Sequence, residues 1–207
     1  MRRAVRGLVL VGMLALAGCG SILPEPAPPP SLYRLTAGAD ADPDKLRPVP
    51  VQLGVDVPAV AAALDTERIA LARTPTTLDY FADAAWTDRL SAMIQALLIQ
   101  SLDDSHRLAA VGPQAGPLHA DVVLVTELRD FEARYDGAGP PHWRVELMAK
   151  LVKMPDRTIL ASRLFDGDAA APRNDMAAIV TTADTAWHQV AQQLVDWVAT
   201  SLAPRPR

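Results

Sequence analysis

Cysteine is almost absent from this chain of 207 residues, because the sequence contains only Cys19. A single thiol excludes an internal disulfide and a cysteine-based zinc cage. The chain also lacks an uninterrupted apolar run of 18 residues, which a lasting membrane span would need. It has no basic excess, since 20 Lys and Arg face 24 Asp and Glu and give a net charge of -4. We therefore expect no nucleic-acid partner.

Sequence motifs for catalysis are missing as well. Neither phosphate-loop pattern, G-x-x-x-x-G-K or G-x-G-x-x-G, occurs, and there is no G-x-S-x-G elbow and no H-E-x-x-H pair. Asp103 and Asp104 are adjacent at a predicted helix end, where their side chains diverge into solvent. We expect no catalytic residue, no metal and no cofactor, although a triad assembled in space would leave no contiguous motif. The histidines are scattered and predicted to lie in loops or on the surface: His106, His119, His142 and His188.

The first eighteen residues have the organisation of a secretory signal. Met1 to Gly7 carries three arginines and no acid, and Leu8 to Ala17 is apolar except for Gly12. A basic start followed by a short apolar run is typical of a signal peptide and too short to span a bilayer stably. We therefore exclude residues 1–18 from the predicted fold.

The end of this signal resembles the lipobox of bacterial lipoproteins. Leu16-Ala17-Gly18-Cys19 places the cysteine directly after two small residues. The resemblance implies cleavage between Gly18 and Cys19, diacylglycerol on the Cys19 thiol, and an acyl chain such as palmitate on the new amino terminus. Gly20, in place of Asp, favours the periplasmic face of the outer membrane of a Gram-negative cell. The alternative is a buried, inert cysteine in an uncleaved helix.

On this interpretation, the acyl chains alone would attach the mature protein to the membrane. Cleavage removes three arginines and leaves 17 basic and 24 acidic residues, a charge of about -7 that anionic lipid would repel. Residues 19–31 form the predicted tether, and five of the seven residues from Pro24 to Pro30 are proline. Such a stretch favours extended polyproline II, which would hold the body roughly 35–40 Å from the bilayer. A proline-rich ligand for a partner groove is the alternative interpretation.

Alternating apolar residues predict most of the strands. Segments 32–36, 49–57, 67–73, 78–81 and 107–111 are short strand candidates, and residues 37–48 are a polar loop. Residues 121–135 are the longest candidate, and the apolar parity changes near Arg129 and Asp130, which predicts a bulge. Residues 143–151 and 158–165, joined by a turn at Pro155-Asp156, complete a predicted antiparallel meander.

Helical spacing predicts two amphipathic helices. The first runs from about Ala84 to Leu102, with Asp83 as its N-cap and Trp86 on its apolar stripe. The second follows Asn174 as its cap, with Asp175 in its first turn. We predict a single α+β domain over residues 32–203, a two-layer sandwich in which two helices pack on one face of a mainly antiparallel sheet. Residues 204–207 are a flexible tail.

Trp197 is the one candidate contact residue. Three of the four tryptophans fall on predicted apolar stripes, so they are expected in the core. Trp197 lies off the centre of the last stripe, where an exposed aromatic ring could anchor a partner.

Several segments together resemble the ABC-type transport auxiliary lipoproteins, the PqiC-like family. They are the lipoprotein start, Leu32-Tyr33-Arg34-Leu35, Leu64-Asp65-Thr66-Glu67-Arg68-Ile69-Ala70, and Leu78-Asp79-Tyr80-Phe81 before Trp86. The resemblance implies a non-enzymatic accessory of a system in which an ABC permease, its ATPase and an MCE-domain protein move lipids or hydrophobic compounds between membranes. It also motivates a homo-oligomer, such as a ring around the partner.

Two other functions stay open from the sequence. One is a periplasmic carrier whose own cavity shields an acyl chain. The other is an envelope-assembly lipoprotein without a transporter partner. Cargo, direction of transport and oligomeric state are not encoded in any motif.

Overall fold

The computed structural model describes residues 28–38 and 48–204. Cys19, most of the predicted tether and most of the predicted 37–48 loop lie outside these residues. In chain order the elements are β1 (Ser31–Tyr33), β2 (Val49–Val55), β3 (Ala59–Val60), β4 (Arg68–Thr74), β5 (Thr77–Trp86), α2 (Leu90–Asp104), β6 (Leu108–Pro113), β7 (Val122–Arg134), β8 (His142–Lys153), β9 (Thr158–Ala170) and α3 (Met176–Leu202). The order of strands, helix, strands and helix is as predicted.

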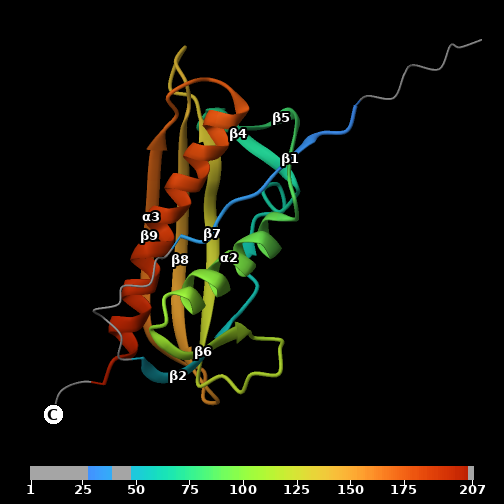
Figure 1. Ribbon diagram of the computed structural model, residues 1–207. Coiled ribbons are helices and arrows are strands. Elements are labelled where there is room, and N and C mark those ends of the chain that lie inside the picture. The colour runs from blue at the N-terminus through green and yellow to red at the C-terminus, as the bar shows by residue number, and fades with distance from the viewer. Residues whose placement is uncertain (1–27, 39–47, 205–207) are drawn as a thin grey trace, which may run out of the picture.

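One sheet, nine-stranded within the described residues, is built around the long strand β7 (Figure 1). On one side β7 pairs antiparallel with β8, and β8 pairs antiparallel with β9, which confirms the predicted meander. On its other side β7 pairs in turn with β2, β3 and β4, all of them parallel. β5 and β1 extend the sheet beyond β4, and β6 extends it beyond β2.

The α+β prediction is therefore confirmed, but the sheet is less antiparallel than expected. Five strand pairs are parallel: β1–β5, β2–β6, β2–β7, β3–β7 and β4–β7. Alternation of apolar and polar residues defines the two faces of a strand but carries no information on its direction. Parallel neighbours also require crossover connections, so they join segments that are far apart in sequence.

The predicted bulge in β7 is confirmed. Its pairing register with β8 shifts between Leu128 and Asp130. Leu128 and Phe131 consequently face the same buried side although their numbers differ in parity. The extra residue keeps one continuous apolar face along β7.

Both helices cover the same face of the sheet (Figure 1). α3 packs on β8 and β9, and α2 packs on β2 and β6. Beneath them the aromatic rings of Trp86, Phe131 and Trp143 meet edge to face, with centroids 5.3–5.9 Å apart. This side of the sheet therefore holds a filled core, as predicted for Trp143 and Trp187, both of which are buried.

The start of α2 differs from its prediction. α2 begins at Leu90, and Trp86 is the last residue of β5, where its N–H donates to the carbonyl of Glu67. Asp83, the predicted N-cap, lies inside β5 with φ of 54°. Trp86 fits the helical spacing with Leu90 and Ile94 by number, yet it reaches the same core from a strand.

A distant loop caps α2 instead. The carboxylate of Asp65 accepts a hydrogen bond from the Ser91 N–H at 3.0 Å, and the carbonyl of Thr66 accepts one from the Leu90 N–H at 3.2 Å. Arg89, at the N-cap position, has no side-chain cap and lies 3.6 Å from Asp65. These bonds satisfy amides at the helix start that lack an intrahelical partner.

α3 begins one residue later than predicted. Asp175 is its N-cap and accepts a hydrogen bond from the Ala178 N–H at 2.9 Å. Asn174, the predicted cap, accepts a hydrogen bond from the Tyr135 hydroxyl at 2.8 Å instead. Asn174 therefore connects the end of β7 to the loop that leads into α3.

Candidate functional site

The face of β7, β8 and β9 that the helices leave uncovered is divided into a charged half and an apolar half. Residues of β8 alternate, so His142, Arg144, Glu146, Met148 and Lys150 point away from the buried stripe. Charged residues of β7 and β9 lie beside the first three. Val125 of β7 and Leu164 of β9 flank Lys150 and Met148 in the other half.

Asp130 is the centre of the charged half. One of its carboxylate oxygens lies 3.0 Å from Arg134 and 3.2 Å from Arg144, and Arg144 also contacts Glu146 at 3.1 Å. Burial lowers the pKa of Arg144 and is the largest single influence, but hydrogen bonds and charge from Asp130 and Glu146 together raise that pKa above its ordinary value. These paired ions connect β7 to β8 across this face of the sheet.

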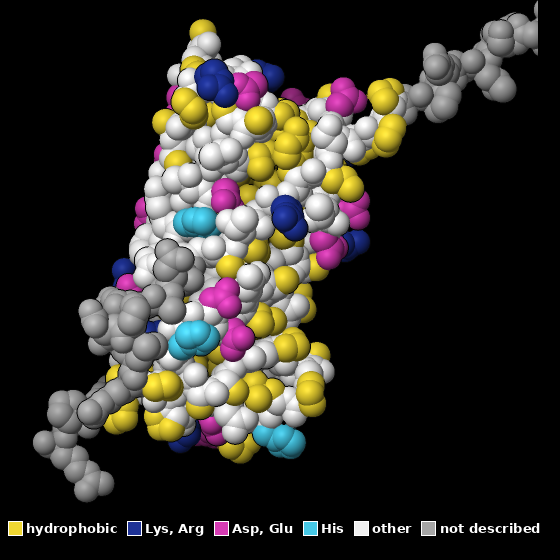
Figure 2. All heavy atoms as spheres, in the orientation of Figure 1, with side chains coloured by type: hydrophobic (Ala, Val, Ile, Leu, Met, Phe, Trp, Pro, Cys, Tyr) yellow, Lys and Arg dark blue, Asp and Glu magenta, His cyan; other side chains and the backbone are white. Residues whose placement is uncertain are grey.

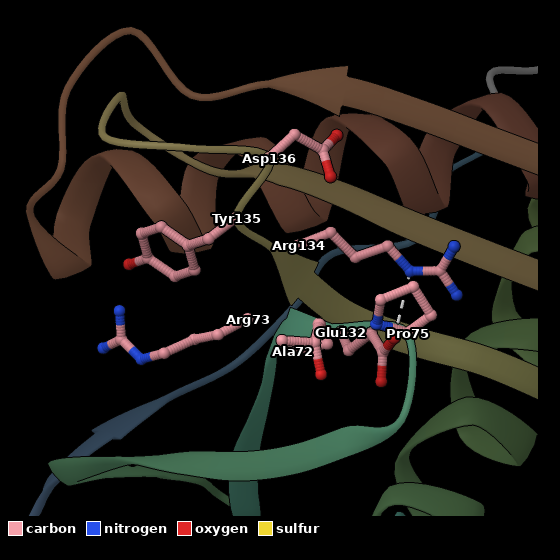
Figure 3. A pocket seen from close by; sticks show the side chains of 8 residues that line it. Ala72, Arg73, Pro75, Glu132, Arg134, Tyr135 and Asp136 are labelled. Atoms are coloured by element: carbon pink, nitrogen blue, oxygen red, sulfur yellow. Dashed lines mark hydrogen bonds and ion pairs between the residues drawn. The ribbon is translucent and has the colours of Figure 1, made fainter.

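A hollow of about 180 Å³ lies where β4 meets the end of β7 (Figure 3). Arg73 and Tyr135 lie next to each other at one side of it, with the guanidinium carbon 5.1 Å from the ring centroid. Burial raises the pKa of Tyr135, although the positive charge of Arg73 opposes the shift. The hydroxyl therefore stays protonated near neutral pH and donates to Asn174, so it serves as a structural donor.

The chain between β1 and residue 38 crosses α3 and is held there by a cluster that the sequence did not indicate. Asp184 accepts hydrogen bonds from the Thr36 N–H at 2.7 Å and from the Thr36 hydroxyl at 2.8 Å. His188 Nε2 lies 2.9 Å from the same hydroxyl and 3.6 Å from Asp184. A catalytic triad needs the acid on the other ring nitrogen, so this cluster is a clasp and not a nucleophile site.

The predicted contact residue Trp197 is half-buried. Its ring meets Phe165 of β9 edge to face at 5.4 Å, and the residue also lines a hollow of about 350 Å³. Arg163, Gln193 and Asp196 also line this hollow, at the border between β9 and the last turns of α3. Trp197 thus contributes to the core and still offers a surface to a partner.

The remaining predicted residues do not gather at one place. Cys19 and Gly18 lie outside the described residues. Asp103 and Asp104 are exposed at the end of α2, as expected. His106 and His119 are exposed too, whereas His142 and His188 are half-buried on β8 and α3. His142 lies 2.9 Å from Asp136 across the β7–β8 loop and 2.8 Å from Asp168, which is 26 residues away in the sequence.

Exposed apolar side chains mark two strand edges. On the helix side, apolar side chains gather beside β1 and β5 (Figure 2), where Leu32 is 65% exposed and Leu78 is 36% exposed. At the opposite edge, Ile159, Leu160 and Leu164 of β9 are exposed. No helix in residues 28–38 and 48–204 is long and apolar enough to cross a bilayer.

Fold and surface together define an α+β body with paired surface ions and apolar strand edges, as expected of a protein that works through contacts. The chain belongs to the family described as the ABC-type transport auxiliary lipoprotein component, whose profile matches residues 33–195. This confirms the resemblance seen in the sequence, and membership in the family implies an accessory role in transport.

Two relatives support this assignment. The crystal structure of XCC0632 from Xanthomonas campestris is 29% identical, covers 83% of this chain and 95% of its own, and superposes with a TM-score of 0.76. The uncharacterized protein bll6063 from Bradyrhizobium diazoefficiens is 30% identical over 148 residues, which are 70% of this chain. That match spans 38% of bll6063. A further solved structure of an uncharacterized protein shares the fold, with a TM-score of 0.64 at 16% identity.

Proposed function

We propose that this protein is a non-enzymatic accessory lipoprotein at the outer membrane, where it docks or receives the MCE-domain protein of an intermembrane transport system. The cargo would be a lipid or another hydrophobic compound. The ABC permease and its ATPase would be separate subunits, because the sequence carries no phosphate-binding loop.

The family match over residues 33–195 is the observation that carries this proposal. It supports the transport role directly, and the lipobox at Cys19 supports attachment to a membrane. Several acyl chains hold a protein on a bilayer almost permanently, since each buried methylene contributes about 0.8 kcal/mol. The MCE partner and the outer membrane rest on the family resemblance and on Gly20.

The filled interior favours the docking role over the carrier role. A carrier needs a cavity between helices and sheet for an acyl chain, and there the buried rings of Trp86, Phe131 and Trp143 pack edge to face. The surface, by contrast, presents exposed apolar side chains at two strand edges. Such a surface suits transient contact with a protein.

Partner capture with lipid analysis tests the proposal. The tagged full chain is purified from gently solubilised envelopes, and the copurifying proteins and lipids are identified by mass spectrometry. We expect an MCE-domain protein and no stoichiometric lipid. Lipid retained without an MCE protein would establish the carrier function instead, and neither ligand together with altered outer-membrane protein levels would indicate an assembly factor.

A further inference from the structure

β9 is an edge strand whose two halves differ. It pairs only with β8, and Figure 1 shows it at the margin of the sheet beside α3. In its second half, the Asp168 N–H donates to Gln189 Oε1 at 3.0 Å, and the Asp166 carbonyl accepts from Gln193 Nε2 at 3.2 Å. Two glutamines of α3 therefore occupy the outward backbone groups of residues 166 and 168.

The first half of the edge has no such cover. Alternate residues of a strand direct their backbone groups to the same side, so Ser162 and Leu164 point outward as Asp166 and Asp168 do. No hydrogen bond from a side chain of the described residues reaches the backbone of Ser162 or Leu164, in contrast to Asp166 and Asp168. Exposed backbone groups beside exposed leucine and isoleucine side chains are a template for another strand.

Along the hairpin beside this open edge the charge is opposite to that of the whole chain, and the carboxylate of Asp196 in the hollow is already paired with Arg107 at 2.9 Å. From residue 150 to residue 164 the β8–β9 hairpin carries four cations, Lys150, Lys153, Arg157 and Arg163, and one carboxylate, Asp156. All four cations are exposed, and no ion pair among the described residues involves any of them. Asp156 is already bonded to the Thr158 hydroxyl at 2.8 Å.

We infer that the open edge of β9, with the hollow beside Trp197, binds an extended apolar and acidic segment of a partner protein as an added strand. Backbone bonds to Ser162 and Leu164 would hold the segment. Its side chains on the helix side would enter the 350 Å³ hollow lined by Arg163 and Trp197, and its carboxylates would meet the unpaired cations. The inference goes beyond the proposed function, because it concerns how a partner binds and not which system it serves.

A second copy of this chain is a poorer occupant. Antiparallel pairing of β9 with itself would bring two cationic hairpins together, and like charges across strands are destabilising. The proline-rich segment 24–30 is also unsuitable, because proline cannot donate to a strand ladder. An extended acidic segment, by contrast, can pair with the outward backbone groups of Ser162 and Leu164 and can also form ion pairs with the cations of the hairpin.

A designed peptide provides the probe. The full chain in detergent is titrated with a labelled peptide that alternates valine with glutamate, and the matched control peptide alternates valine with lysine. We expect the acidic peptide to bind at least about tenfold more tightly than the basic one and to weaken as salt is added. Hydrogen exchange should slow at the Ser162 and Leu164 amides, and hardly at the Asp168 amide, which is already bonded.

Three variants separate the contribution of the backbone hydrogen bonds to peptide binding from that of the cations. Ser162→Pro removes an outward N–H and should reduce binding about tenfold, whereas the matched Ser162→Ala retains the N–H and should bind like the parent. Lys150→Glu combined with Arg163→Glu changes two exposed side chains and should abolish the preference for the acidic peptide. If Ser162→Pro unfolds the protein, the charge variant and hydrogen exchange still decide the question.

Equal binding of both peptides, or binding without protection at Ser162 and Leu164, would overturn the inference. Self-association that protects the same two amides in the absence of peptide would also overturn it, because the occupant would then be a second copy.

Discussion

Asp65 lies in the loop between β3 and β4, yet its carboxylate completes the first turn of α2 by accepting the Ser91 N–H at 3.0 Å. Asp65 belongs to the Leu64–Ala70 segment on which the family resemblance partly rests. A capping acceptor provided from 26 residues away couples the start of the helix to the strand layer.

Replacing Asp65 with alanine tests this connection. Asp65→Ala removes the acceptor from a partly buried amide and should lower the free energy of unfolding by about 1 kcal/mol. Asp65→Asn keeps an acceptor oxygen and should lose only part of that stability. Urea denaturation of both variants checks the prediction, and equal losses would show that the negative charge, and not the hydrogen bond, stabilises the helix.

At the scale of single residues, the sequence predicts which side chains are buried better than it predicts the secondary structure to which they belong. Trp86 was expected in the core and is buried there, but it occupies a strand and not the helix. The spacing of Trp86, Leu90 and Ile94 fits one helix face, while the bond from the Trp86 N–H to Glu67 is formed with a distant segment. The local periodicity of a sequence does not reveal a hydrogen bond to a residue that becomes a neighbour only when the chain folds.

At the scale of elements, β9 and α3 approach each other closely at Gly167. A Cβ atom at this position would collide with the carbonyl oxygen of Ala186 and would lie 3.0 Å from Val190 Cγ2. At this position the strand can therefore lie against the helix only because a side chain is missing, and Gln189 and Gln193 of the same helix lie beside the β9 edge.

Gly167→Ala should therefore separate the two elements. We expect a loss of about 1–3 kcal/mol in the free energy of unfolding, the usual effect of forcing an extra methyl group into a packed contact. Gly139→Ala is the matched control, since nothing lies within 4 Å of a Cβ built there, and it should leave stability nearly unchanged. Thermal or urea denaturation measures both, and an equally stable Gly167→Ala would contradict the close contact.

Elements with a clear local pattern were predicted well. The bulge after Leu128 followed from alternation, and the meander of β7, β8 and β9 followed from alternation together with the turns between these strands, because neighbouring strands joined by short turns pair antiparallel. The parallel partners of β7 could not be predicted in this way. β2, β3 and β4 are connected to β7 through crossovers, and the periodicity of a strand does not indicate which distant strand it will pair with. The clasp of Thr36 on Asp184 and His188 was missed for the same reason.

For the whole molecule, charged side chains and the two helices are distributed unevenly over the faces of the sheet, and the proposed function depends on that distribution. The helices close one face of the sheet, while the other carries paired ions in one half and mainly apolar side chains beside the exposed Lys150 in the other. Trp197 was indicated by its place on the helix, but the hollow beside it depends on β9 and could not be foreseen. The proposed membrane address, by contrast, rests entirely on the sequence around Cys19.

The last prediction concerns that address. Cys19→Ser removes the thiol that lipid attachment requires, while every core side chain of the described body is retained. The variant should therefore unfold at the same temperature as the parent but leave the outer-membrane fraction, since an acidic body has little affinity of its own for anionic lipid. Flotation of envelopes and intact-mass measurement check both parts, with Ser21→Ala as a control that keeps the thiol. An unmodified thiol with a retained leader in the parent would exclude the lipoprotein assignment, and transport at the parental rate by a variant free of the membrane would show that anchoring is dispensable.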